Sequence, residues 1–336
     1  MDYSAFKDYI AENIKEFLSD KYADSQVTIQ SVVKNNETLD AITITSPDTN
    51  VSPTIYLNSY FEQYENGKSM DTILESIAAV REEHEVDKAF DVSKITEYDE
   101  VKDKIYCKLV GVENNEKMLQ ERPYTLVGDD LAATYHVSLG EDSNGSMSVP
   151  ITNQLMENYG LSPKQLHFLA IQNMPTLSPS TFKGMNEVMA EMMLPQMIAD
   201  FDGDREAAEA MLNSMIPPED KMFVLTNVAK LNGASCMLDT SIMDSIKERV
   251  GDFFILPSSI HEVLVVPKNA GMDLSELEAM VKEVNATQVA PQDRLSDHVY
   301  AYDAEAKEIY RADLEDEHRA KVDEMSQSTT RKASGR

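Results

Sequence analysis

The chain has 336 residues, of which 42% are hydrophobic and 26% are charged, a composition typical of a globular protein with about two domains of roughly 150 residues each. Its 30 basic and 59 acidic residues give a net charge of −29, which excludes nucleic-acid binding through a broad basic surface and favours cationic partners. No basic segment precedes an apolar one at the N-terminus, and no apolar run approaches the ~18 residues of a membrane span. We therefore expect a cytoplasmic protein without a membrane partner.

The first block of the chain, residues 1–115, predicts helices together with short strands. Residues 4–20 carry apolar side chains at helical spacing and predict an amphipathic helix. The elements that follow in chain order are a hairpin of strands 26–33 and 39–46, a strand at 54–57, helices at 59–65 and 69–83, an acidic helical connector to about residue 103, and a strand at 104–112.

The second block, residues 116–312, is richer in predicted strands, and Asn232-Gly233 is its strongest hairpin signal. Its predicted elements are strands 124–127, 132–139 and 146–151, helices 152–159 and 163–174, a helical segment 181–216 with breaks near 195 and 200–204, strands 223–231 and 234–238, a helix 241–250, two strands within 252–269, a helix 273–284, and a hairpin of 298–302 with 308–311. The polar tail 313–336 is expected to be disordered at its end. Together these elements predict an α+β fold with mixed, mainly antiparallel sheets and packed helices.

His261 and Glu262 are the best candidates for catalytic chemistry. A histidine beside a glutamate is typical of a general base with an orienting carboxylate, or of two metal ligands. The pair opens an apolar run that predicts a strand, however, and adjacent residues on a strand point to opposite faces. The second histidine of the H-E-x-x-H motif is also missing. We therefore favour a structural histidine, hydrogen-bonded at a sheet edge.

Ser259 and Asn227 are further catalytic candidates, because the first precedes His261 by two residues and the second lies on the neighbouring predicted hairpin. Ser259 lacks the glycines of a nucleophile elbow, so we favour a role in capping its turn. The sequence contains no phosphate-binding glycine motif and no Cys-x-x-Cys. A calcium loop that began at Asp200 would require glycine at its sixth position and glutamate at its twelfth, but the sequence has Arg205 and Met211 there. We accordingly expect no cofactor and no metal.

Methionine is unusually frequent, with nineteen in the chain and eight of them between residues 181 and 222. Met185, Met189 and Met192 have the i, i+4, i+7 spacing of an apolar helix face. The commoner role of such methionines is to fill a core, but flexible thioethers also suit an adaptable groove or a partner helix. The sequence therefore predicts a protein partner that binds through the Met-rich helices 181–216.

Six segments of the sequence carry a family resemblance: Tyr56–Asn58, Tyr60–Gly67, Arg122–Tyr124, Ile151–Asn153, Met222–Ala234 and Phe253–Pro267. They resemble a bacterial family of unknown function found in gut Firmicutes, domain of unknown function 5688. The resemblance covers most of residues 1–312 and implies a cytosolic bacterial protein. It implies no activity and no functional residues.

Three hypotheses for the function follow from the sequence. The leading one is a non-enzymatic binding or interaction protein, because catalytic motifs are missing, the charge is strongly negative and one segment is rich in methionine. The alternative is a hydrolase-like enzyme that uses His261 and Glu262 with Ser259 or Asn227. The weakest is an acidic mimic of nucleic acid, because Lys and Arg interrupt most of the acidic runs that a dense acidic face would need.

Overall fold

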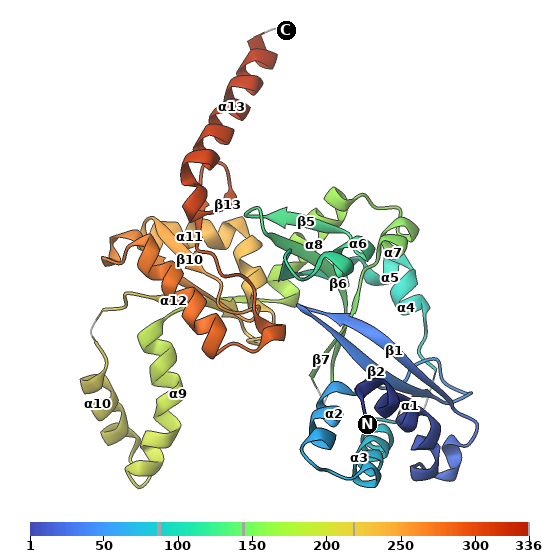
Figure 1. Ribbon diagram of the computed structural model, residues 1–336. Coiled ribbons are helices and arrows are strands. Elements are labelled where there is room, and N and C mark those ends of the chain that lie inside the picture. The colour runs from blue at the N-terminus through green and yellow to red at the C-terminus, as the bar shows by residue number, and fades with distance from the viewer. Residues whose placement is uncertain (86–88, 143–144, 218, 335–336) are drawn as a thin grey trace. The chain divides into compact units, whose positions relative to one another are not determined.

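A computed structural model describes residues 1–85, 89–142, 145–217 and 219–334 (Figure 1). Residues 86–88 of the expected connector and the last two residues of the tail lie outside the described residues. The chain forms two compact units, Met1–Lys94 and Ile95–Arg336. The α+β prediction is confirmed, since helices accompany three sheets whose described strand pairs are all antiparallel.

The N-terminal unit packs helices on a three-stranded sheet of order β1-β2-β3. Its elements are α1 (Tyr3–Asn13), η1 (Ile14–Phe17), η2 (Asp20–Tyr22), β1 (Gln26–Lys34), β2 (Glu37–Thr45), β3 (Ile55–Tyr56), α2 (Asn58–Glu65) and α3 (Met70–Glu83); α4 (Ser93–Thr96) straddles its boundary. The predicted hairpin is confirmed as β1 and β2, in the register Lys34↔Glu37. Phe6 and Ile10 of α1 bury their side chains together with Ile42 and Ile77 in a hydrophobic core that lies within the N-terminal unit.

The second unit contains a four-stranded sheet in which β6 pairs with β4, β5 and β7. The elements of this part are α5 (Tyr98–Val101), η3 (Lys102–Lys104), β4 (Ile105–Gly111), α6 (Glu116–Glu121), β5 (Tyr124–Val127), β6 (Leu131–Asp142), β7 (Gly145–Pro150), α7 (Asn153–Asn158) and α8 (Pro163–Leu177). Helix α8 begins with a capping box of Ser162 and Gln165 and buries Leu166 and Ala170 against the sheet.

A six-stranded sheet of order β13-β12-β10-β11-β9-β8 forms the rest of this unit. Its elements are β8 (Ser180–Gly184), α9 (Met185–Asp200), α10 (Arg205–Met215), β9 (Phe223–Asn227), η4 (Gly233–Leu238), α11 (Thr240–Val250), β10 (Phe253–Leu256), β11 (Val263–Pro267), η5 (Lys268–Ala270), α12 (Leu274–Thr287), η6 (Pro291–Asp293), β12 (Tyr300–Asp303), β13 (Glu308–Arg311), η7 (Ala312–Leu314) and α13 (Glu315–Ser334). The two strands expected within 252–269 are confirmed as the antiparallel pair β10 and β11.

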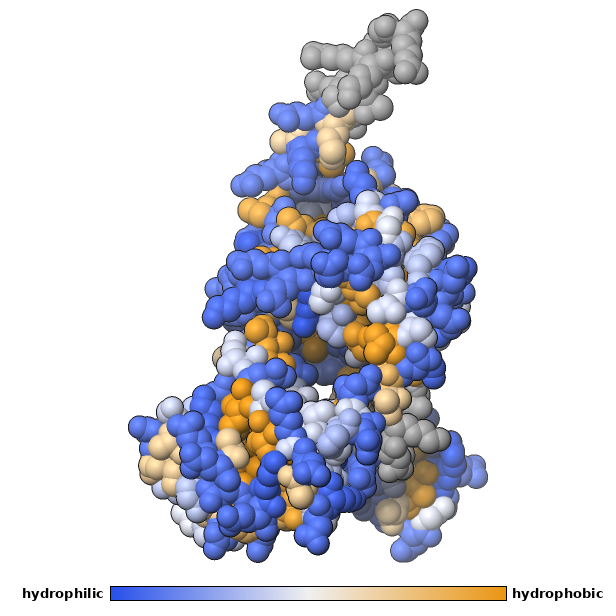
Figure 2. Space-filling model, turned by 90° about the vertical axis from the view of Figure 1, so that its right-hand side faces the viewer, coloured by the Kyte–Doolittle hydropathy of each residue, from blue (hydrophilic) through white to orange (hydrophobic). Residues whose placement is uncertain are grey.

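Three local expectations are corrected. The chain after Asn232-Gly233 forms the 3-10 helix η4 and not the second strand of a hairpin, because Asn232 turns in a left-handed conformation (φ 54°) and η4 buries Ala234 and Cys236 in the core. The start of the Met-rich segment, Ser180–Gly184, is strand β8. The polar tail forms α13 as far as Ser334. The face shown in Figure 2 is mostly hydrophilic, as the charge content requires.

Candidate binding groove

The six-stranded sheet packs one face on a hydrophobic core and leaves part of the other face accessible at its β8 end. Side chains alternate between the two faces, so Phe223 and Leu225 of β9 enter the core that also contains Val263 of β11. Val224 and Leu264, their neighbours in sequence, point to the opposite face. There α12 covers β10, β11 and β12 through Leu277 and Val281, among others.

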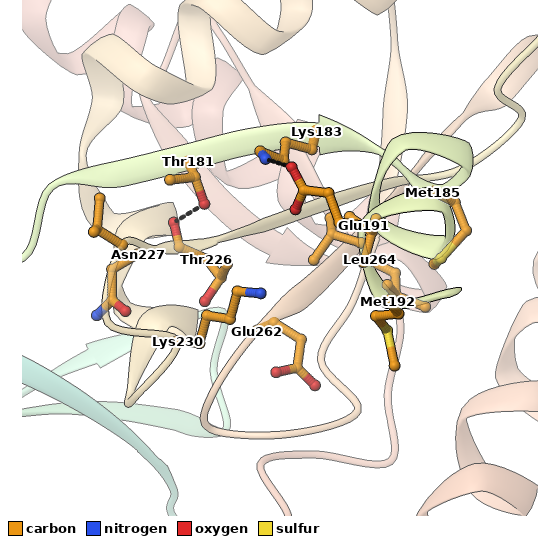
Figure 3. A pocket seen from close by; sticks show the side chains of 13 residues that line it. Thr181, Lys183, Met185, Glu191, Met192, Thr226, Asn227, Lys230, Glu262 and Leu264 are labelled. Atoms are coloured by element: carbon orange, nitrogen blue, oxygen red, sulfur yellow. Dashed lines mark hydrogen bonds and ion pairs between the residues drawn. The ribbon is translucent and has the colours of Figure 1, made fainter. Parts of the chain in front are cut away.

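A pocket of about 610 Å³ lies over the uncovered part of this second face (Figure 3). Its floor is formed by β8, β9 and β11, and its wall by α9. Leu264 borders both the pocket and the cluster beneath α12. The lining residues are Thr181, Lys183, Met185, Val188, Glu191, Met192, Val224, Thr226, Asn227, Val228, Lys230, Glu262 and Leu264. We call this pocket the groove.

Helix α9 is held at the edge of the sheet by its first turn and by one lysine. The N–H of Met185 donates a hydrogen bond to the carbonyl of Met222 at 2.9 Å, directly after β8 ends. Lys183 of β8 forms ion pairs with Glu187 (3.2 Å) and Glu191 of α9. The hydrogen bond with Glu191 raises the pKa of Lys183, and the same bond lowers the pKa of Glu191. These contacts fix the groove wall relative to its floor.

Helix α9 is unusual because it is rich in apolar residues and yet none of its residues is buried. The helix carries methionine, valine, leucine and isoleucine on several sides, and such helices are normally enclosed. Here Met192 is 74% exposed and Met189 is 45% exposed. Helix α10 contacts α9 and buries Ala208 and Leu212, but this covers only part of the α9 surface. The groove side of α9 remains open.

His261 is not among the residues that line the groove, and both of its ring nitrogens have structural partners. Nδ1 accepts a hydrogen bond from the N–H of Asn232 at 3.2 Å, and Nε2 lies 3.3 Å from Oδ1 of Asp293. The acceptor role of Nδ1 places the ring proton on Nε2. The carbonyl of His261 accepts a bond of 2.7 Å from the hydroxyl of Thr226. His261 therefore joins the turn before η4 and the end of η6 to strand β9.

Glu262 lines the groove, so it diverges from His261 as the alternation of adjacent residues predicts. Both residues precede β11, which begins at Val263, whereas the sequence pattern placed them on the strand itself. Glu262 makes no ion pair with any described residue. Its carboxylate points into the open space beside Lys230 (Figure 3).

Ser259 and Asn227 are both engaged with backbone groups. The hydroxyl of Ser259 accepts a bond of 2.8 Å from the N–H of His261, and it makes no bond to the His261 ring in the described chain. The amide of Asn227 donates to Ser178 and to the carbonyl of Leu231, and its oxygen accepts from the N–H of Leu231. The four candidate residues thus do not converge on one reacting atom. Their catalytic role stays a prediction.

Most of the groove floor was not predicted from the sequence. Val224 and Leu264 were recognised only as apolar residues of strands, and Lys183 and Lys230 were not recognised at all. The signal was the period-2 alternation along 222–228 and 262–266, which assigns Val224 and Leu264 to the same face. That face was invisible from sequence alone because the order β11-β9-β8 brings together strands that are far apart in the chain.

No group of three or more histidine, cysteine or carboxylate side chains in the described segments is arranged to hold a metal ion. None of the helices within those segments has the length and apolar character that crossing a membrane demands.

Comparison with known proteins identifies a family. The model for a family described as "Family of unknown function (DUF5688)" matches residues 3–304. This match confirms the resemblance noted in the sequence. No curated protein and no solved structure matches the chain.

Proposed function

The chain belongs to this family of unknown function, and from its own groove we propose that it is a non-enzymatic binding protein. The groove between α9 and the sheet holds an apolar segment of another protein. The observation that carries this proposal is α9, a helix that has apolar side chains on several sides and no buried residue. A partner that covers Met192 and Val224 would remove this apolar surface from water.

The energetics of such a contact suit reversible binding. Full burial of a methionine or valine side chain contributes about 1.5–3 kcal/mol. Three or four groove side chains would therefore supply a useful fraction of the roughly 8 kcal/mol that a micromolar complex requires, after the entropy of association is subtracted. The methionines add adaptability, because unbranched thioethers rearrange to fit different apolar shapes.

A binding role is preferred over a hydrolase because of the contacts of the candidate residues. Ser259 is bonded to a backbone N–H, and Asn227 is saturated by Ser178 and Leu231. The partners of the His261 ring are Asn232 and Asp293. These are the bonds of residues that hold turns together.

The proposal includes a cytoplasmic location in a bacterium. Cys107 and Cys236 are both buried free thiols. Burial raises the pKa of each thiol, which keeps it in the unreactive protonated form. Free thiols without disulfides are the usual state of cysteine in a reducing compartment.

Selection from a displayed peptide library on the immobilised full-length protein tests the proposal. We expect enriched peptides with regularly spaced apolar residues. In fluorescence anisotropy, those peptides are expected to bind the variant Met192→Glu at least tenfold more weakly than they bind the wild-type protein. Met192 is 74% exposed, so this substitution leaves folding intact. Met280→Glu is the matched control, because Met280 is an exposed methionine on α12 outside the groove. No enrichment, or equal binding to both variants, would contradict the proposal.

A further inference from the structure

We infer that the segment bound in the groove is a basic amphipathic helix, an inference that rests on the proposed function. The first reason is the charge of the wall. Between Met185 and Ile216 there are seven acidic residues and one basic residue. The acidic residues are Glu187, Glu191, Asp200, Asp202, Asp204, Glu206 and Glu209. The single arginine, Arg205, already forms an ion pair with Glu209 at 2.7 Å.

The negative charge is concentrated where α9 ends. Asp200 is the last residue of α9, and Asp202 follows two positions later in a left-handed turn (φ 53°). The C-terminal end of a helix carries the negative end of its macrodipole, so acidic residues there are unfavourable unless a cation compensates them. Neither residue forms an ion pair within the described chain. Asp200 accepts a hydrogen bond from the amide of Gln196 at 2.9 Å, and Asp204 caps the N-terminus of α10. A cationic partner would add the ion pair that Asp200 and Asp202 do not make within the described chain.

The lysines of the groove do not reverse this charge. Lys183 is neutralised by Glu187 and Glu191 through its two ion pairs. The charge of Lys230 acts on Glu191, where it contributes to the lowered pKa of that carboxyl. Glu262 adds a further carboxylate that lacks an ion-pair partner among the described residues. The lining of the groove thus carries two lysines and two glutamates, and the acidic excess comes from the rest of α9, α10 and the turn between them, which adds six acidic residues against Arg205.

The shape of the groove favours a helix as the occupant. Met185, Val188 and Met192 line it at i, i+3 and i+7, a single stripe along α9 about 10 Å long. Such a stripe packs against the apolar stripe of another helix, and helix-in-groove binding uses the same spacing of anchors. On the same sheet face α12 already covers the neighbouring strands, and Leu264 borders both regions. A bound helix would continue this helical layer.

Charge also separates the possible occupants. A second copy of this chain would bring its own equally acidic α9 and α10 to the groove. An anionic lipid surface would be repelled by the same carboxylates. A lysine- and arginine-rich helix is attracted by them. The partner chemistry that fits both the apolar stripe and the carboxylates is therefore a basic amphipathic helix.

Two synthetic helical peptides with the same apolar face test this inference on the full-length protein. One peptide carries lysine and arginine on its polar face, and the other carries glutamine. We expect the basic peptide to bind about tenfold tighter at low salt, with the difference shrinking as salt screens the charges. Binding of both is expected to weaken in Met192→Glu and to shift the methyl signals of Met185 and Met192 in spectra of ¹³C-methionine-labelled protein.

A triple charge variant isolates the acidic wall. In Asp200→Asn/Asp202→Asn/Glu206→Gln we expect the basic peptide to lose most of its tenfold advantage while the glutamine peptide is unaffected. Asparagine tolerates the left-handed turn at position 202. The control, Asp8→Asn/Glu12→Gln/Glu16→Gln, removes the same charge from exposed positions on and just after α1 of the N-terminal unit and is expected to keep the advantage.

The outcomes distinguish the two levels of the proposal. Equal binding of the two peptides, lost in Met192→Glu, would overturn the basic partner and leave the binding groove standing. A dimer in sedimentation that Met192→Glu dissociates, or binding to anionic vesicles alone, would assign a different occupant and likewise overturn the inference. Binding of neither peptide, together with an empty library selection, would overturn the proposed function itself.

Discussion

At the scale of single residues, the side chains that the sequence marks as the strongest catalytic candidates mostly have a structural role. They hold turns together by hydrogen bonds. His261 was a candidate because Glu262 follows it, and Asn227 because it lies on the neighbouring predicted hairpin, but each uses its polar atoms to hold a turn. The sequence could identify the residue types but not their partners, because Asp293 and Ser178 are distant in the chain. Only the folded structure shows that Glu262 alone of the four carries an uncommitted charge into the groove.

Another histidine, His136 of β6, predicts a dependence of stability on pH. Its ring is buried, and Nδ1 lacks a hydrogen-bond partner among the described residues. Burial, followed by repulsion from Lys108 and Arg122, holds the pKa of His136 well below the ordinary value of 6.5. The unfolded chain therefore takes up this proton first as pH falls, so the stability that the neutral ring contributes above pH 6.5 is lost below it.

The variant His136→Gln tests this linkage. Urea unfolding at pH 7, 6 and 5 is expected to show a decline in wild-type stability of up to about 1.4 kcal/mol per pH unit from this one group. The decline between pH 6.5 and 5 is expected to be shallower in His136→Gln, because its side chain does not titrate. Parallel curves for the two proteins would show that His136 is protonated equally in the folded and unfolded states.

At the scale of elements, the alternation of apolar and polar residues predicted the strands well. The turn sequence after β9, however, led to the wrong prediction of a strand where the chain forms η4. Asn232-Gly233 is typical of a two-residue hairpin, and the residues after it are apolar enough for a strand. The chain instead enters η4, because the sheet position beside β9 is already taken by β11, which pairs Val263 with Leu225. A local turn signal carries no information about β11, a strand that begins only at Val263 and occupies the position beside β9. The groove floor depends on this same pairing.

Gly233 shows how tightly η4 is seated against β9. A Cβ at this position would lie 2.2 Å from the hydroxyl oxygen of Thr226, 2.5 Å from the carbonyl oxygen of His261 and 2.7 Å from the N–H nitrogen of Asn227. Two of these atoms belong to the backbone and cannot move aside cheaply. We expect Gly233→Ala to lower the free energy of unfolding by about 1–3 kcal/mol, the usual cost of overpacking.

Asn232→Gly is the matched control for Gly233→Ala in urea unfolding. Glycine adopts the left-handed conformation of Asn232 readily, and the N–H that bonds to His261 is retained. The change is therefore expected to alter stability by less than about 1 kcal/mol. A Gly233→Ala protein as stable as wild type would mean that η4 can lift from β9 without cost.

At the scale of the whole molecule, composition predicted about two globular parts but could not place the boundary between them. The expected boundary lay near residue 115, after the predicted strand 104–112. The contacts divide the chain at Lys94 instead. Strand β4 accounts for the difference, since it pairs with β6 and buries Ile105 and Cys107 beneath α8. Which strand a segment joins is a long-range property that local periodicity does not contain.

Two fragments place this boundary experimentally. Residues 1–94 include the whole core of Phe6, Ile42 and Ile77 with β1, β2 and β3, so we expect a monomer with a single cooperative thermal transition. Residues 1–115 add β4 without its partner β6. An unpaired apolar strand is a template for aggregation, so this longer fragment is expected to self-associate in size-exclusion chromatography. A folded, monomeric 1–115 beside an unfolded 1–94 would instead place β4 with the N-terminal unit, because only contacts made by β4 could then stabilise it.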